Sequence, residues 1–295
     1  MNEFRTYHPL VNAVYFFVII VFSAFFTHPV CLLASLFGAF SYSALLGGAK
    51  NVTRNLLYMI PTIILMTLIN PLFNHEGVTV IGYLPSGNPL TMESVLYGFS
   101  ASVMIICVIC WFSCMSKVMT SDKFIYVFGR IAPSLALLLS MTLRFVPRLG
   151  VKMREISSAR KCIGKDTSHG KFSERIKSGV AIISILVTWS LENSIDTSDS
   201  MKARGYGLGR RSSFTTYKFD KRDAFALVTV VSLALYSFVG AILGYTSFRY
   251  YPSVRGADIS VFGVSVFAAY FALCLIPVII EIREAWRWKS LRSKI

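Results

Sequence analysis

Six apolar stretches of near-spanning length recur along the chain, and this recurrence constrains the fold more than any other feature. Each is close to the ~20 residues that a helix needs to cross the hydrocarbon core of a bilayer. Charged residues make up only 15% of the 295 residues, too few to cover a soluble globule of this size. The sequence therefore predicts an all-α polytopic membrane protein with about six transmembrane helices, at 10–27, 30–46, 55–73, 94–116, 224–245 and 259–280. Because only His28 and Pro29 separate the first two, we expect a tight turn there.

Positive charge is concentrated in three parts of the chain. Of the thirty Lys and Arg, ten lie in 144–178, seven in 201–222 and five in 281–295, and the formal net charge is +15. Basic segments beside membrane spans are typical of the cytoplasmic side. The pattern therefore predicts a multi-pass protein with cytoplasmic N- and C-termini. Binding to nucleic acid is not expected, because no aromatic stacking platform interleaves with the basic residues.

Two further apolar runs, 131–146 and 179–191, lie within the basic middle of the chain. If both crossed the membrane, nine Lys and Arg of 147–178 would lie outside, and Arg144 would sit in the bilayer at a cost of roughly 2.5–3.5 kcal/mol. Both runs are also short of a span. We therefore expect an amphipathic helical hairpin that packs beneath the other helices on the cytoplasmic side. The predicted organisation is 1–116 with four transmembrane helices, 117–222 with the hairpin, and 223–295 with two more helices and a basic tail.

Prolines and glycines suggest the boundaries of the hairpin helices. Pro133 and Pro147 predict that the first arm is two helices, one from about Asp122 and one from Pro147 to about Cys162. The second arm, 172–203, has no internal proline and is expected to be one helix of about 50 Å at 1.5 Å per residue.

Three carboxylates follow one face of the second half of this arm: Glu192, Asp196 and Asp199. One interpretation is a latch of ion pairs with Lys152 or Arg154 of the first arm. The other is a solvated helix face, which is the commoner role of such a row.

Both arms close in an alanine–arginine pair followed by glycine. The first reads Ala159-Arg160-Lys161 with Gly164 soon after, and the second reads Ala203-Arg204-Gly205. Glycine is a common helix stop because it accepts left-handed dihedral angles. The guanidinium presents a planar fork of donors, and the small alanine lets another surface approach. Each arginine could instead cap only its own helix, but the repetition favours a docking role.

The strings LRFVPRL…REISSARKCIG (143–164) and MKARGYGLGRRSSF (201–214) resemble the transmembrane T component of energy-coupling factor transporters, the family that includes cobalt-transport permease subunits. The resemblance implies two crossed coupling helices in a bacterial or archaeal cell membrane. Their tips would insert into grooves of two ATP-binding-cassette subunits, while a separate small S component captures a vitamin or metal. Carried over, Ala159, Arg160 and Lys161 form one tip and Ala203, Arg204 and Gly205 the other. Lys161 departs from the small residue that the family often has there.

No motif in the sequence indicates catalysis or nucleotide binding by this chain. The nearest approach to a phosphate-binding loop is Gly164 followed by Gly170-Lys171, where Phe172 replaces the required hydroxyl. We therefore expect a subunit that is not an enzyme and holds no cofactor, with ATP and Mg²⁺ bound by the partner ATPases. Cys107, Cys110 and Cys114 share one helix face and could hold a soft metal, but thiols also pack well between helices, which is the favoured interpretation.

The expected spans also lack the buried Asp, Glu or His that a proton-coupled carrier would need. Asn70 is one of few polar residues in them, and could line a path or bond to a neighbour. Two alternatives remain: a permease that carries the substrate itself, which predicts a single short coupling helix, and an intramembrane enzyme such as a polyprenyl transferase, which needs paired carboxylates and a metal.

Overall fold

The computed structural model describes residues 3–83, 88–165, 172–208, 217–256 and 260–292. The chain divides into two compact units. Unit 1 comprises Met1–Lys123 and Tyr217–Ile295, and unit 2 comprises Phe124–Thr216. Unit 2 lies inside the predicted 117–222 module. The chain is an all-α polytopic membrane protein in its main architecture, as the apolar runs predicted.

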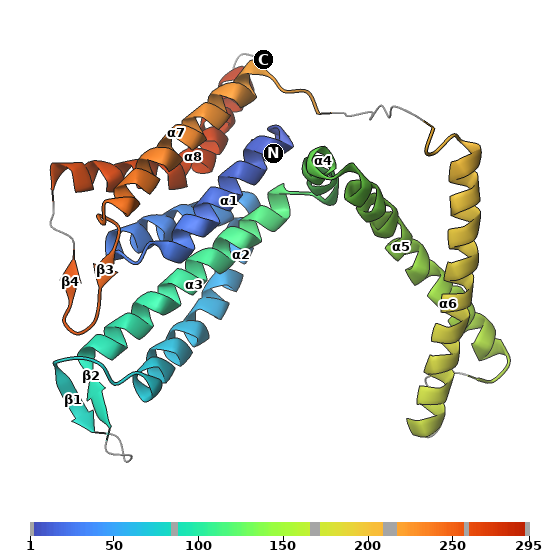
Figure 1. Ribbon diagram of the computed structural model, residues 1–295, viewed down its shortest axis with the longest axis horizontal. Helices are drawn as coiled ribbons and strands as arrows, with labels where there is room; N and C mark the ends of the chain where they lie inside the picture. Colours follow the sequence, from blue (N-terminus) through green and yellow to red (C-terminus); the bar gives the residue numbers. More distant parts are fainter. Residues whose placement is uncertain (1–2, 84–87, 166–171, 209–216, 257–259, 293–295) are drawn as a thin grey trace. The chain divides into compact units, whose positions relative to one another are not determined.

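Unit 1 is a bundle of five helices, α1 (Pro9–Phe25), α2 (Pro29–Phe73), α3 (Met92–Val118), α7 (Lys221–Ile242) and α8 (Val261–Arg292), preceded by a 3₁₀ turn, η1 (Phe4–Thr6). α2 packs along α3 and also against α8, while α7 lies beside α8 (Figure 1). The core is unusually aromatic, with fully buried Tyr15, Tyr42, Trp111 and Tyr270. Trp111 Nε1 donates to Ser35 Oγ at 3.0 Å and Tyr15 Oη donates to Cys274 O at 3.4 Å, whereas Tyr42 Oη has no hydrogen-bond partner among the described residues.

The predicted turn between the first two spans is confirmed. α1 ends at Phe25 and α2 begins with Pro29 in its first turn, where a proline lacks only an N–H that has no helical partner. The His28 side chain caps α2 by accepting from Val30 N at 3.3 Å. Further along, α2 is interrupted at Gly48, whose dihedral angles (φ 64°, ψ −167°) are not helical. The second and third expected spans therefore follow each other through this glycine with no intervening loop.

Six helices are long and apolar enough to cross a membrane among the residues described, but they are not the six that were expected. Pro29–Gly48, α3, α7 and α8 qualify, together with the two arms of the hairpin, Pro133–Cys162 and Phe172–Ala203. Pro9–Phe25 and Met59–Phe73 are shorter apolar helices. The argument that the two hairpin runs are too short to span was therefore wrong, since each run continues into a helix of 30 or 32 residues.

Two short antiparallel hairpins in unit 1 were not predicted. β1 (Val80–Tyr83) pairs with β2 (Pro89–Thr91), and β3 (Phe248–Arg249) pairs with β4 (Arg255–Gly256). The first contains Val and Ile followed by Tyr, residue types that favour extended backbone. The first hairpin lies in the connection between α2 and α3, and the second lies in the connection between α7 and α8. They therefore leave the helical architecture unchanged.

Unit 1 buries carboxylates and a histidine just outside the expected spans, so they do not contradict the prediction for the spans themselves. Glu93, Asp223, Glu281 and His8 are all less than a tenth exposed, and each lies one or two residues beyond the end of an expected span. Asn70 bonds to its neighbours, donating to Ser94 O at 2.6 Å and Tyr251 Oη at 3.2 Å, which is the plainer of its two interpretations.

The cysteines of α3 pack between helices. Cys107, Cys110 and Cys114 are buried free thiols, and Cys107 Sγ donates to Leu32 O of α2 at 3.7 Å. Among the described residues, no group of three or more His, Cys, Asp or Glu side chains could hold a metal ion.

Unit 2 consists of most of α4 (Ser121–Ile131), with α5 (Pro133–Cys162) and α6 (Phe172–Ala203). The predicted break before Pro133 is present at Ala132, because the residue before a proline disfavours helical dihedral angles. The predicted start of a helix at Pro147 is wrong: the helix α5 already begins at Pro133 and continues through Pro147. A proline removes a single helical hydrogen bond, and the flanking residues keep theirs. The bounds of α6 match the prediction. Gly170 and Lys171 lie outside the described residues.

Candidate functional site

α5 and α6 cross each other (Figure 1), and a pair of stacked aromatic rings joins them. The rings of Phe145 and Trp189 have centroids 5.8 Å apart and an interplanar angle of 6°. Lys152 of α5 places its Nζ 5.8 Å from the centroid of the Trp189 ring, which adds a cation–π contact to the same crossing. The two arms are therefore joined by ring contacts near the middle of each helix.

The crossing lies the same number of residues before each of the two arginines. Arg160 lies fifteen residues after Phe145, and Arg204 lies fifteen residues after Trp189. At 1.5 Å per residue, each tip is about 22 Å along its helix from the crossing. Because the helices run in opposite directions along the hairpin, the crossed pair carries its two arginines at the ends of arms of matched length.

The first tip ends in a Schellman motif, the double hydrogen bond that commonly closes a helix around a left-handed residue. Lys165 N donates to Arg160 O at 3.0 Å and Gly164 N donates to Lys161 O at 3.0 Å. Gly164 has φ of 72°, as the predicted helix stop requires. Arg160 therefore lies within the last helical turn.

The second tip has the same motif, but its left-handed glycine lies three residues closer to the arginine than in the first tip. Tyr206 N donates to Met201 O at 3.0 Å and Gly205 N donates to Lys202 O at 2.9 Å, with φ of 80° at Gly205. Arg204 is thus the capping residue itself, immediately after the end of α6 at Ala203. The two alanine–arginine pairs are equivalent in distance from the crossing and different in their position in the cap.

Both caps close through backbone groups alone. In the part of the chain that the structure describes, neither guanidinium bonds to the carbonyls of its own helix end, so the alternative in which each arginine caps its helix is not realised. Ala159 and Ala203 are exposed beside their arginines. Arg204 is exposed, whereas Arg160 is half-buried and its Nε is a buried donor with no hydrogen-bond partner in the structure. An unpaired buried donor is unfavourable, and an acceptor supplied from outside would relieve it.

A basic groove lies between the N-terminal half of α5 and the C-terminal half of α6. It has a volume of about 850 Å³, and Arg204 lies at its edge. The charged residues that line it are all cations: Arg144, Arg148, Lys202 and Arg204. The second tip therefore belongs to a larger positive surface, whereas the first stands apart from it.

The acidic row on α6 does not form the latch. Glu192, Asp196 and Asp199 are exposed, and Asp199 pairs within its own helix with Lys202 at 3.5 Å. On the other arm, Lys152 pairs with Glu155 at 2.9 Å and Arg154 Nε donates to Gly150 O at 3.2 Å. Among the described residues, the row is a solvated helix face, and the contact between the arms comes from Phe145, Trp189 and Lys152 instead.

Sequence reasoning had not singled out Phe145 and Trp189. A signal was present, since each aromatic residue precedes its alanine–arginine pair by the same number of residues. A shared spacing in two helices indicates a shared crossing point only if the helices are known to pair, and that pairing is a tertiary contact.

These features define a class of protein: a multi-pass membrane protein that carries a crossed pair of long helices with matched arginine tips. The model of the family described as "Cobalt transport protein" (CbiQ) matches residues 4–215. The chain belongs to this family, and it is a membrane component of a transporter.

Curated relatives agree with this assignment. Two are named energy-coupling factor transporter transmembrane protein EcfT: one from Staphylococcus aureus is 27% identical over 60% of this chain and 72% of its own length. The other, from Streptococcus thermophilus, is 27% identical over 77% of this chain and 89% of its own length. A third of the same name, from Listeria innocua, is 33% identical over 34% of this chain, and that match spans 38% of the relative.

Proposed function

We propose that this chain is the energy-coupling subunit of an importer, and that it transmits movement from two cytoplasmic ATP-binding-cassette subunits to a separate vitamin- or metal-binding S component in the membrane. The ATPases bind ATP and Mg²⁺, and this chain binds neither. The relatives' names, which refer to an energy-coupling factor transporter, support an assembly of several subunits.

One observation carries the proposal: the matched distance of Arg160 and Arg204 from the crossing of α5 and α6. Two partners of the same kind would meet two arginines on arms of equal length. Each guanidinium is free of its own helix end and can give a bidentate hydrogen bond to a carboxylate or to backbone carbonyls of a partner.

In this proposal, α5 and α6 transmit the movement as rigid helices. Closure of the ATPases on ATP displaces the tips, and helices of 30 and 32 residues shift as units between discrete arrangements. The apolar residues in the first half of α6, which include Val180, Ile183 and Val187 at more than half exposed, would cover or release the S component. This route requires the tips, and with them both termini, to face the cytoplasm.

The test is co-purification of the two ATPases with tagged variants of this chain. The double change Arg160→Glu and Arg204→Glu places carboxylates where the partner must offer acceptors, so we expect recovery of the ATPases to fall at least tenfold while the variant still inserts into the membrane. Arg154→Glu is the matched control, because it reverses an exposed arginine of α5 whose Nε donates to Gly150 O of the same helix. Full recovery of the ATPases with the double variant would refute the docking role.

A further inference from the structure

The chain leaves unit 1 after Lys123 and returns to it at Tyr217, so two junctions connect the hairpin unit to the bundle. Both junctions are bonded to one short segment at the N-terminus, Phe4–His8. All of these contacts lie within unit 1. They bring together residues more than a hundred positions apart in the sequence.

At the first junction, Lys123 is only 4% exposed, and its ammonium group is fully hydrogen-bonded. Nζ donates to the carbonyl oxygens of Arg5 and Tyr7. With its amide oriented to suit both neighbours, Asn12 accepts from Nζ at 2.7 Å and donates to Phe4 O at 3.1 Å. Three acceptors thus match the three donors of the ammonium, which is what a buried cation requires.

At the second junction, Asp223 is 3% exposed and accepts at both oxygens. Oδ1 accepts from His8 N at 3.2 Å, and Oδ2 accepts from Asp220 N at 3.2 Å and closes the N-terminal cap of α7. Beside it, the Arg222 guanidinium lies 4.3 Å from the centroid of the Tyr7 ring and donates to Thr6 Oγ1 at 3.3 Å.

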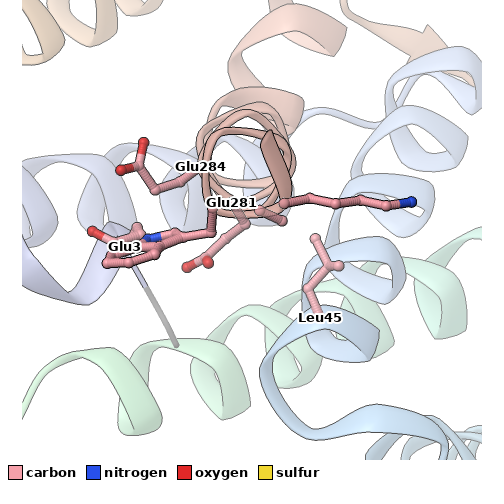
Figure 2. Close-up of a pocket in the computed structure, with 7 residues that line it drawn as sticks. Glu3, Leu45, Glu281 and Glu284 are labelled. Atoms are coloured by element: carbon pink, nitrogen blue, oxygen red, sulfur yellow. The ribbon is translucent and has the colours of Figure 1, made fainter. Parts of the chain in front are cut away.

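The N-terminal segment is itself fixed to the core of unit 1. Phe4 is fully buried, and its ring centroid lies within 6.2 Å of four other rings: Tyr7, Tyr15, Phe16 and Tyr42. Its backbone N–H donates to Glu281 Oε1 at 3.1 Å. Figure 2 shows Glu281 projecting from α8 beside Glu3. The segment is thus held by α1, α2 and α8, while it holds α4 and α7.

We propose that Phe4–His8 is a fixed anchor for both junctions of the hairpin unit, and that Lys123 and Asp223 are positioning residues that keep the base of the hairpin still while the arms move. The proposal rests on the proposed function, because a lever transmits movement only when its base is held. Displacing either junction would leave a buried ammonium or carboxylate without partners, so the burial of these charges opposes movement at the base. Movement would then begin beyond the anchor, where α4 gives way to α5 at Ala132.

The first test measures the position of the hairpin relative to the bundle in the complex with its ATPases. Spin labels are placed at Ser184→Cys and Trp286→Cys in a Cys162→Ser background, since both positions are exposed and one lies in each unit. We expect Lys123→Met to broaden the resting distance distribution at least twofold, and to halve the shift caused by MgATP with vanadate, with the ATPases still bound. Lys218→Met, an exposed lysine at the second junction, should match the wild type. An unchanged resting width in Lys123→Met would overturn the anchor.

The second test does not depend on whether Lys123→Met folds. Thr6→Cys and Arg222→Cys in the same Cys162→Ser background are joined by a short bismaleimide, which ties the N-terminal segment to α7. A fixed anchor tolerates this link, so nucleotide-driven hairpin movement and ATP hydrolysis should stay within twofold of the unlinked protein; arrest of movement by the link would overturn the anchor. If MgATP with vanadate did not shift the spin-label distance in the wild type, that result would count against the proposed function. The width of the distance distribution without nucleotide would still test the anchor.

Discussion

Phe145 and Trp189 stack with nearly parallel rings at the crossing of α5 and α6, and each lies the same number of residues before an arginine tip. This contact defines where the arms meet, and few other contacts between the two arms bury side chains. In unit 2, Ala136 and Ile182 are the buried apolar residues among those described. The geometry of the tips therefore depends strongly on one pair of rings.

Trp189→Ala should loosen the crossing. An aromatic pair contributes about 0.5–1.5 kcal/mol beyond the area that it buries, and the contact with Lys152 is lost as well. We expect faster hydrogen exchange of the α5 and α6 amides around the crossing and weaker nucleotide-driven movement, measured by mass spectrometry of the purified complex. Trp189→Phe should restore most of the protection. Trp286→Ala, which removes an exposed tryptophan from α8, should leave unit 2 unaffected, and equal loss of protection in both alanine variants would contradict this role for the crossing.

Arg160→Met should weaken docking without lowering the stability of the isolated chain. The Arg160 Nε is buried without a partner, and an unsatisfied buried donor costs about 1–3 kcal/mol, so its removal does not destabilise the free protein. We expect the melting temperature in detergent to stay the same or rise slightly, while recovery of the ATPases falls. A lower melting temperature with unchanged recovery would show that Arg160 supports the fold rather than the partner.

Gly164→Ala should strain the first tip, because a left-handed residue other than glycine costs roughly 1–2 kcal/mol. Among the described residues, no atom beyond the adjacent residues lies within 4 Å of an added Cβ, so we assign the cost to the dihedral angle. Gly150→Ala is the matched control: it also meets open space, but it lies inside α5, where alanine is favoured by about 1 kcal/mol. We expect opposite changes in the helicity of peptides spanning 146–168, measured by circular dichroism. A stabilising effect at both positions would contradict the Schellman motif.

The pKa of Lys123 gives a pH dependence with a defined sign. Burial is the main cause that lowers its pKa from 10.5 to about 8, and the nearby Arg5 lowers it further, while Asp223 raises it. Between about pH 8 and 10.5, the unfolded chain therefore binds more protons than the folded one, and the contribution of Lys123 to stability rises with pH across this window. Thermal unfolding at pH 7.5 and pH 9.5 measures this effect. The melting temperature of the wild type, relative to that of Lys123→Met, should be higher at pH 9.5 than at pH 7.5. An equal difference at both pH values would contradict the burial of the ammonium.

The sequence predicted the features that depend on local chemistry. Pro29, Pro133 and Gly164 each limit the backbone in their own neighbourhood, and the helix boundaries near them were predicted correctly. Pro147 was the exception, because its local cost competes with a helix that gains hydrogen bonds on both sides.

Features that depend on distant residues were not predictable in the same way. Lys123 meets Arg5 across 118 positions, and Glu281 meets Phe4 across 277. No periodicity or motif records such a pairing, so the buried charges of unit 1 were missed. The ring contact of Phe145 with Trp189 belongs to the same group, although the alanine–arginine pairs that it positions were evident from the sequence alone.

The matched arms have a mechanical consequence. A swing of about 10° around the ring pair would carry each tip through an arc of about 4 Å, given arms of about 22 Å. Both arginine tips would be displaced by the same distance, so two ATPases that move together would apply equal forces to the two arms. If one arm were shorter by a single helical turn, the two arginine tips would be displaced by different distances. The hairpin would then rotate as a whole, whereas arms of equal length open and close symmetrically.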